Sequence, residues 1–248
     1  MKTYISLTAQ QIAQLEAQSC RCEDWTNVLV DPEFDPEYIR NANFSGQIKL
    51  GAFRKIFTLA GGIHKHSGIY HATLHNVVVG DDCMIEHVRN YIANYVIGSG
   101  SYLENVTDLI TYGETTFGNG IKINVLNETG GREVAIHDHL SSHEAYISAL
   151  YRHKPALTEA LDAMVERYAA SVSAPFGVIG ENVEILDAMH IVNVNVGAYC
   201  KIKGVSRLRN GSIISCKEDP VEIGMNVIAD DFIVESGSKI TDGVMISK

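Results

Sequence analysis

The sequence predicts an all-β protein whose short strands wind into a parallel β-helix, a solenoid built from short strands and corners. The main observation is that large apolar residues recur at every sixth position over a long stretch. A period of six differs from the 3.6 of a helix and the 2 of a flat strand, and hexapeptide repeats are typical of a parallel β-helix. The series is Val79, Ile85, Tyr91, Ile97, Leu103 and Leu109.

Glycines and small residues at fixed places in the hexad support this fold. Glycine suits a sharp corner because it has no Cβ, and it follows the apolar residue in Val79-Gly80, Ile97-Gly98, Phe117-Gly118, Ile179-Gly180, Val196-Gly197 and Ile223-Gly224. A small residue often stands four positions after the apolar one, as Cys83, Ser101 and Cys200 do. A narrow interior would then hold one large and one small residue on each face.

The period returns in the second half of the chain. The predicted inward residues there are Ile179, Ile185 and Ile191, then Val196, Ile202, Leu208 and Ile214, and finally Ile228, Val234, Ile240 and Ile246. We therefore predict two blocks of β-helix, at residues 46–140 and 175–248. The alternative is an ordinary all-β domain in which the spacing arises by chance.

Residues 1–45 are predicted to cover the first turn of the solenoid. Thr8 and Gln11 have the spacing of a capping box, which predicts a short helix that continues to about Gln18. Solenoids need such covers because an open first turn offers unpaired strand edges to other chains.

A change of period predicts a two-helix insertion at residues 141–174. Ser141 and Glu144 form a second candidate capping box, and Pro155 would end or kink the helix that follows. Apolar residues then recur at helical spacing, at Leu157, Leu161, Met164, Val165, Tyr168 and Val172.

Composition excludes several classes of function. The formal net charge of −10 disfavours binding to nucleic acids or anionic membranes, because both need clustered basic residues. No apolar stretch is long enough to span a bilayer, and the N-terminus has no apolar signal core. Five cysteines without a framework of spacings fit a reducing compartment. We therefore expect a cytoplasmic protein.

The densest group of chemically useful residues lies where the six-residue period breaks. Gly130 and Gly131 allow a tight loop whose backbone N–H groups approach a ligand, and Arg132 suits a phosphate or carboxylate. The predicted substrate-binding residues are Asn127, Glu128, Gly130, Gly131 and Arg132, and the predicted catalytic residues are His139 and His137. A neutral imidazole can act as a general base near pH 7. The alternative is a junction whose polar residues only satisfy backbone groups.

Other histidines carry less specific signals. His71 and His87 both stand two positions after an apolar residue, on the solvent side of the predicted hexad, and are expected to lie near each other. Their spacing does not match that of the γ-class carbonic anhydrases, which use a β-helix and three histidine ligands. We expect no metal.

The repeat resembles that of the hexapeptide-repeat transferases, and this resemblance implies a left-handed β-helix. Longer stretches are similar to an uncharacterised bacterial family of longer proteins, loosely similar to UDP-N-acetylglucosamine acyltransferases. These stretches include Lys65-His66-Ser67-Gly68-Ile69-Tyr70, Arg89-Asn90-Tyr91-Ile92-Ala93-Asn94-Tyr95 and Leu126-Asn127-Glu128-Thr129-Gly130-Gly131-Arg132-Glu133. The resemblance further implies trimeric self-association and an acyl-CoA donor.

The leading expectation is therefore an acyl- or acetyltransferase that acts on a sugar or nucleotide-sugar acceptor. His139 would deprotonate the acceptor, and backbone N–H groups near Gly130 and Gly131 would stabilise the oxyanion. The alternative is a non-catalytic β-helical scaffold or assembly module. The final hexad at Ile246 has no capping helix after it, so we expect either a longer protein or capping by self-association.

Overall fold

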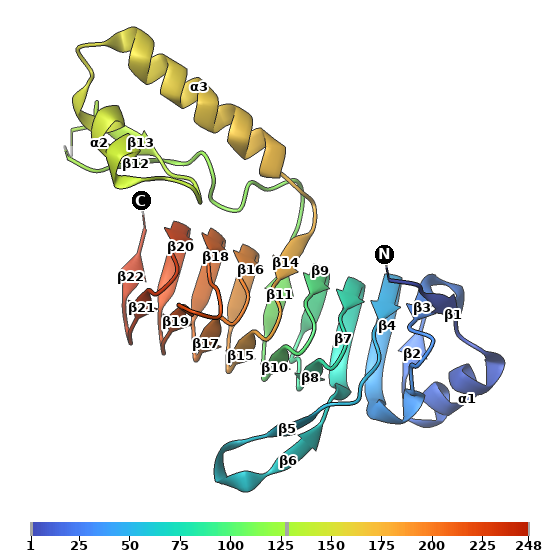
Figure 1. The fold of residues 1–248 in the computed structure, drawn as a ribbon. Helices are drawn as coiled ribbons and strands as arrows, with labels where there is room; N and C mark the ends of the chain where they lie inside the picture. Colours follow the sequence, from blue (N-terminus) through green and yellow to red (C-terminus); the bar gives the residue numbers. More distant parts are fainter. Residues whose placement is uncertain (1, 127–128, 248) are drawn as a thin grey trace.

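The computed structural model describes residues 2–126 and 129–247 (Figure 1). Within them the chain is mostly β, with one 18-stranded sheet and two separate two-stranded antiparallel sheets. The three α-helices are α1 (Ala9–Ala17), α2 (Ser142–Leu150) and α3 (Pro155–Val172). No helix among these residues is long and apolar enough to cross a membrane.

The strands follow one another along the chain as short segments. Their bounds are β1 (Ile5–Ser6), β2 (Arg21–Cys22), β3 (Val28–Val30), β4 (Ile39–Leu50), β5 (Ile56–Thr58), β6 (His64–His66), β7 (Gly68–Val79), β8 (Met84–Glu86), β9 (Tyr91–Ile97), β10 (Tyr102–Glu104), β11 (Asp108–Ile110), β12 (Lys122–Asn124), β13 (Glu133–Ala135), β14 (Gly177–Ile179), β15 (Glu184–Leu186), β16 (His190–Val196), β17 (Lys201–Lys203), β18 (Arg207–Ile213), β19 (Glu222–Ile223), β20 (Ile228–Val234), β21 (Lys239–Ile240) and β22 (Met245–Ile246). Three short 3-10 turns lie at Trp25–Asn27, Pro36–Tyr38 and Ala60–Gly62.

The large sheet is parallel except where β1 pairs with β3. Leu103 pairs with Ile85, and Ile97 pairs with Val79, in the same register. The Asp81 N–H donates to the Ser99 side chain 18 positions later, whereas contacts such as Val178 N–H to Asn195 Oδ1 span 17. Residues about 17 or 18 positions apart in the chain are therefore neighbours in adjacent parallel strands.

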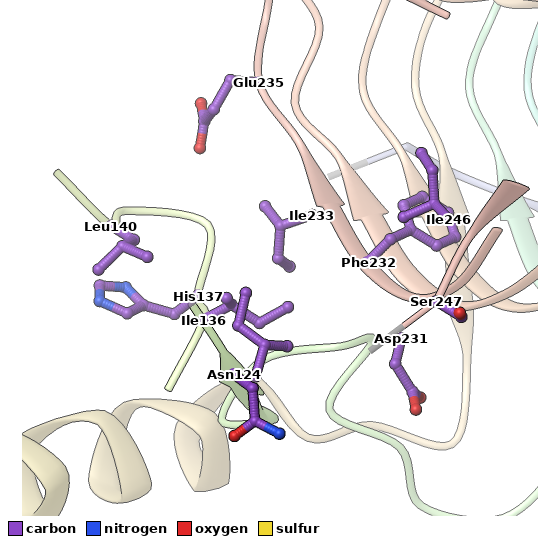
Figure 2. A pocket seen from close by; sticks show the side chains of 11 residues that line it. Asn124, Ile136, His137, Leu140, Asp231, Phe232, Ile233, Glu235, Ile246 and Ser247 are labelled. Atoms are coloured by element: carbon purple, nitrogen blue, oxygen red, sulfur yellow. The ribbon is translucent and has the colours of Figure 1, made fainter. Parts of the chain in front are cut away.

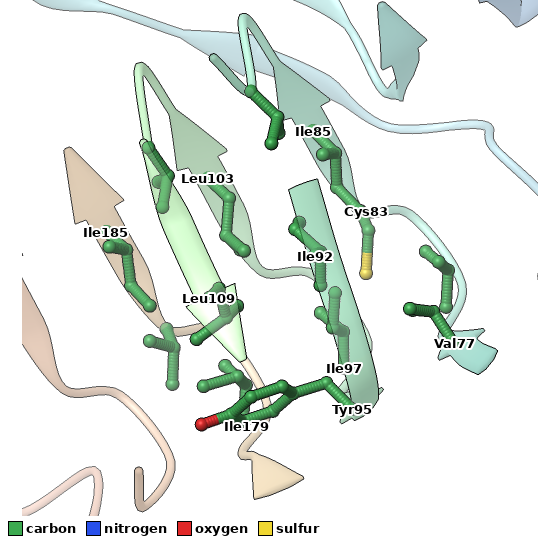
Figure 3. Packing of buried hydrophobic residues seen from close by; sticks show 14 of the residues in the cluster. Val77, Cys83, Ile85, Ile92, Tyr95, Ile97, Leu103, Leu109, Ile179 and Ile185 are labelled. Atoms are coloured by element: carbon green, nitrogen blue, oxygen red, sulfur yellow. The ribbon is translucent and has the colours of Figure 1, made fainter. Parts of the chain in front are cut away.

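Stacked rows of large aliphatic side chains form the core between the strands. In one row, Ile85, Leu103 and Ile185 are all fully buried and paired in register. Figure 3 shows these side chains and those of Ile92 and Leu109 together in the interior. Cys83 lies in the same interior as predicted, and burial raises the pKa of its thiol to about 12.

Three predicted inward positions are wrong by one residue. Tyr91 is 37% exposed, and Ile92 beside it is the buried residue that pairs with Leu74 and Leu109. In the same way Ile213 is buried instead of Ile214, and Ala229 instead of Ile228. Each error falls at one end of a seven-residue strand (β9, β18 or β20), where two hexads are joined without the usual break.

Asparagine, aspartate and histidine occupy many of the corners with left-handed backbone. Their φ values lie between 51° and 57° at Asn41, His71, His87, Asn105 and Asp187. Asparagine and aspartate tolerate this region because their side chains hydrogen-bond locally. The His71 and His87 rings stack with centroids 5.1 Å apart, which confirms that these two residues are neighbours.

The short N-terminal helix is confirmed, including its capping box. The Thr8 side chain accepts the Gln11 N–H at 3.2 Å, and the Gln11 side chain accepts the Thr8 N–H at 2.9 Å. Leu15 of this helix is fully buried in the core.

The segment that separates the two parts of the parallel sheet is not a two-helix insertion. Parallel pairing stops at β11 and resumes at β14, and we call the intervening residues 111–176 the interruption. It holds the antiparallel pair β12–β13 as well as α2 and α3. Across it, Val183 bonds to Ser101, 82 positions earlier, in the place where a neighbour about 18 positions earlier is usual. The helical spacing of apolar residues did not predict the hairpin, because β12 and β13 are only three residues each.

A second excursion, the hairpin β5–β6, projects from the sheet (Figure 1). Its base is held by aromatic and ionic contacts: the Phe57 ring stacks on Tyr102 at 5.4 Å, and Lys65 Nζ lies 2.6 Å from the Glu86 carboxylate. No hairpin was predicted here, because the hexad register around these residues is ambiguous in the sequence.

From the buried hydroxyl of Tyr95 we predict that the protein loses stability at alkaline pH. Its hydroxyl donates to the Val194 carbonyl at 2.8 Å, and burial raises its pKa to about 12. An unfolded tyrosine ionises near pH ~10, so the unfolded chain loses this proton first. Stability is therefore unaffected below about pH 10 and falls as pH rises toward about 12. Urea midpoints measured across this window should fall less steeply for Tyr95→Phe than for the wild type; equal slopes would contradict the prediction.

Candidate functional site

The candidate site lies where the interruption folds back over the last strands of the large sheet (Figure 1). Near residue 117 the chain is fastened to β18: Ser212 Oγ donates to the Phe117 carbonyl at 2.8 Å, and the Gly118 N–H donates to Asn210 Oδ1 at 3.1 Å. Gly118 has φ +84°, and a Cβ there would lie 2.8 Å from the Phe232 carbonyl oxygen. This close approach holds the start of the interruption against β18 and β20.

His137 is the most enclosed of the predicted site residues. It is 6% exposed, and its Nε2 lies 3.1 Å from Glu144 Oε1. Ser141 caps α2 by accepting the Glu144 N–H at 3.2 Å, which brings the carboxylate toward the ring. The His139 N–H donates to Nδ1 at 3.3 Å, so the ring proton sits on Nε2. Both ring nitrogens of His137 therefore have protein partners.

Asp138 and Tyr168 form a second polar pair beside this ring. The Tyr168 hydroxyl donates to the Asp138 carboxylate. Burial, and then this bond, raise the pKa of Tyr168 to about 12. The Asp138 N–H donates to Asn119 Oδ1 at 2.9 Å. His139 is exposed, with its ring 5.3 Å from that of Tyr168. Hairpin and α3 are thus joined by a polar cluster of His137, Asp138, Glu144 and Tyr168.

The predicted substrate-binding loop lies apart from these histidines. Asn127 and Glu128 fall outside the described residues. Gly130 and Gly131 have φ values of 84° and 93°, and Arg132 is exposed. The Gly131 N–H donates to Glu133 Oε1 at 2.7 Å. Glu133 begins β13 and His137 follows its end, so β13 separates the loop from the two histidines.

A cavity of about 320 Å³ lies between the interruption and the end of the sheet (Figure 2). Its walls are mainly aliphatic and aromatic. One wall comes from the interruption and the other from β20 and β22. The lining residues are Ile123, Asn124, Ile136, His137 and Leu140 on the first side, and Asp231, Phe232, Ile233, Glu235, Ile246 and Ser247 on the second.

Of the residues that line this cavity, only His137 was among the predicted site residues. Phe232 and Ile233 on the other wall lie about a hundred residues further along the chain. Their sequence pattern predicts only that they belong to a strand, which is β20. The contacts of Phe117 and Gly118 with β18 and β20 hold the first wall near the second. Among residues 2–126 and 129–247, no group of three or more metal-ligating side chains gathers.

The pair of His137 and Glu144 is expected to hold the hairpin against α2. His137→Ala should speed amide hydrogen exchange in β12 and β13 several-fold, because the carboxylate loses its buried partner. Exchange in the large sheet should stay unchanged. His143→Ala is the matched control, because His143 is exposed and lies beside Glu144 in the chain. Equal protection of the hairpin in both variants would contradict this role.

Comparisons with known proteins place the chain in a family. A family model described as "Domain of unknown function (DUF4954)" matches residues 4–248. A protein of Treponema pallidum (strain Nichols), described as "Uncharacterized protein", is 27% identical over 245 residues, which cover 94% of this chain and 34% of the relative. The chain thus spans about a third of that relative's length. The predicted resemblance to an uncharacterised bacterial family is confirmed. Because the match takes in nearly every residue, the chain belongs to the DUF4954 family.

Proposed function

We propose that the large sheet is a left-handed β-helix of the hexapeptide-repeat type. Three features support this proposal: pairing with a period of 17 or 18 residues, rows of buried aliphatic side chains, and corners with left-handed backbone. Such a solenoid is rigid, because each pass is bonded to the passes on both sides. Self-association as a trimer remains part of this proposal, and sedimentation of the purified chain would test it.

The function that this geometry supports best is that of a β-helical scaffold which binds a small ligand in the cavity. The observation that carries it is the cavity itself, which is walled by apolar side chains from two distant parts of the chain. Its volume is at the lower end of the range for small-molecule sites, which are mostly apolar with a few polar groups. Both ring nitrogens of His137 already bond to protein groups, Nε2 to Glu144 and Nδ1 to the His139 N–H, which favours a structural role for His137.

Acyl transfer to a sugar or nucleotide-sugar acceptor from acyl-CoA is the second candidate. The pair of Glu144 and His137 favours it, because a carboxylate on Nε2–H orients a histidine whose Nδ1 then acts as the base. Nδ1 would become available once the 3.3 Å contact with the His139 N–H opens. The Gly131 N–H, which was expected to stabilise the oxyanion, bonds to Glu133 instead. The pair of His137 and Glu144 is therefore the one observation that supports this candidate.

A neutral probe tests the binding function. Selective labelling of isoleucine methyl groups reports on Ile123, Ile136, Ile233 and Ile246, which all line the cavity. We expect 4-phenylbutan-1-ol to shift these signals and to leave Ile85 and Ile185 of the core unchanged. Ile233→Trp should abolish the shifts by filling the space, whereas Val96→Trp, on an exposed part of β9, should preserve them. Probe-independent signals at all four residues would overturn the proposal.

Acyl transfer is tested separately by release of free CoA thiol from acetyl-CoA in the presence of an amino-sugar acceptor. The second candidate expects release that depends on the acceptor and is lost in His137→Ala. Absence of release with amino-sugar and UDP-sugar acceptors would overturn it while leaving the binding function intact.

A further inference from the structure

The polar groups around the cavity are all hydrogen-bond acceptors or can act as acceptors. Glu235 stands at one end, and Asp231 at the other (Figure 2). Asn124 and Ser247 add an amide and a hydroxyl to the lining. Within residues 2–126 and 129–247, no lysine or arginine lines the cavity. A ligand that enters it therefore meets two carboxylates and no fixed positive charge.

Among the described residues, the carboxylates at the two ends also lack cationic partners. In the part of the chain that the structure describes, no ion pair includes Asp231 or Glu235. Asp231 accepts one bond, from Asn210 Nδ2 at 2.7 Å, which leaves its second oxygen for a ligand. The nearest lysine on the hairpin, Lys122, is engaged by Asp162 at 2.7 Å. Asp231 and Glu235 therefore carry negative charge that no described cation neutralises.

Between these ends most of the cavity lining is apolar. Ile136 and Leu140 face Phe232, Ile233 and Ile246 across it (Figure 2). Removing such surface from water favours an apolar ligand body, whereas a phosphate-rich group such as that of coenzyme A would be repelled by both carboxylates.

We infer that the ligand of this cavity is a small amphipathic amine, with an apolar body between the two walls and a protonated amino group at Glu235 or Asp231. This inference rests on the proposed binding function and specifies its ligand class. The ammonium group has three N–H donors and a positive charge, which match a carboxylate at the mouth of an apolar site.

Three probes of equal length test the charge requirement: 4-phenylbutylamine, 4-phenylbutan-1-ol and 4-phenylbutanoate. We expect the amine to bind about fivefold more tightly than the alcohol, the scale of one exposed charge pair, and the carboxylate to bind most weakly. The same four isoleucine methyl signals report each titration. If the alcohol binds as tightly as the amine, the amine inference fails and the binding function stands. If no probe moves these signals, both fail.

Conservative variants locate the charge. Glu235→Gln and Asp231→Asn keep size and hydrogen bonding, and asparagine tolerates the φ of 56° at position 231. We expect one of them, or the pair together, to reduce the preference for amine over alcohol to less than about twofold. Glu181→Gln, an exposed carboxylate outside the cavity, should retain the full preference. A preference that survives the double variant would overturn the assignment.

Discussion

Replacing Ile97 with alanine is expected to lower the free energy of unfolding by about 2–5 kcal/mol, the usual range for an aliphatic side chain removed from a packed core. Ile97 is 1% exposed and lies between Val79 and Ile179 in adjacent strands. Its loss leaves a cavity that both neighbours border. Urea unfolding followed by circular dichroism would measure the change.

Val96 provides the matched control, because it is the preceding residue of the same strand. It points outward and is 37% exposed. Val96→Thr keeps the β-branched shape and should change stability by less than about 0.5 kcal/mol. Similar effects at the two positions would contradict the assignment of inward and outward faces in β9.

Gly177→Ala is expected to destabilise the protein by about 3 kcal/mol, at the upper end of the cost of overpacking. Gly177 opens β14, the first strand after the interruption. A Cβ there would lie 2.4 Å from Cε1 of the buried Tyr95 ring and 2.5 Å from Thr111 Oγ1. The ring is fully enclosed and bonded to Val194, so it has little room to move. Denaturant unfolding would measure the loss.

Gly113→Ala separates crowding from backbone strain. Gly113 has φ +65° and open space around its missing Cβ, so alanine there costs about 1–2 kcal/mol of left-handed strain without a clash.

In a Tyr95→Leu background, the added cost of Gly177→Ala should shrink because the aromatic ring is gone. An unchanged cost would show that the ring is not the obstacle.

Much of the parallel sheet could be predicted because its interior repeats. Ile85 and Leu103 are separated by the usual distance in the chain between adjacent strands, whereas the interruption lies between Leu103 and Ile185. All three side chains face the same interior. The period fails by one residue at Tyr91, where the strand continues through a corner at Asn94 with left-handed backbone. A fixed period cannot detect such a slip, because both neighbours are apolar.

The excursions and the cavity were harder to predict. The hairpins β5–β6 and β12–β13 are short, and their residues carry no strong alternation. The predicted caps at Thr8 and Ser141 did locate two helix starts, because a cap depends only on residues within one turn. The full capping box forms at Thr8, whereas at Ser141 only the N-cap bond forms and the Glu144 side chain contacts His137 instead. His137 was identified, but its partners Glu144 and Tyr168 were not assigned to it, because helices α2 and α3 determine that contact.

The sequence by itself determined the β class and the buried rows of apolar side chains, since these follow from contacts between residues at a fixed separation in the chain. It predicted a break in the strands after residue 140, but only the tertiary structure decided that parallel pairing stops at β11 and that a hairpin precedes the helices. The bonds of Phe117 and Gly118 to β18 span more than ninety residues and set the second wall of the cavity beside the first. No local pattern encodes that separation, because it depends on how many strands join the parallel sheet after the interruption.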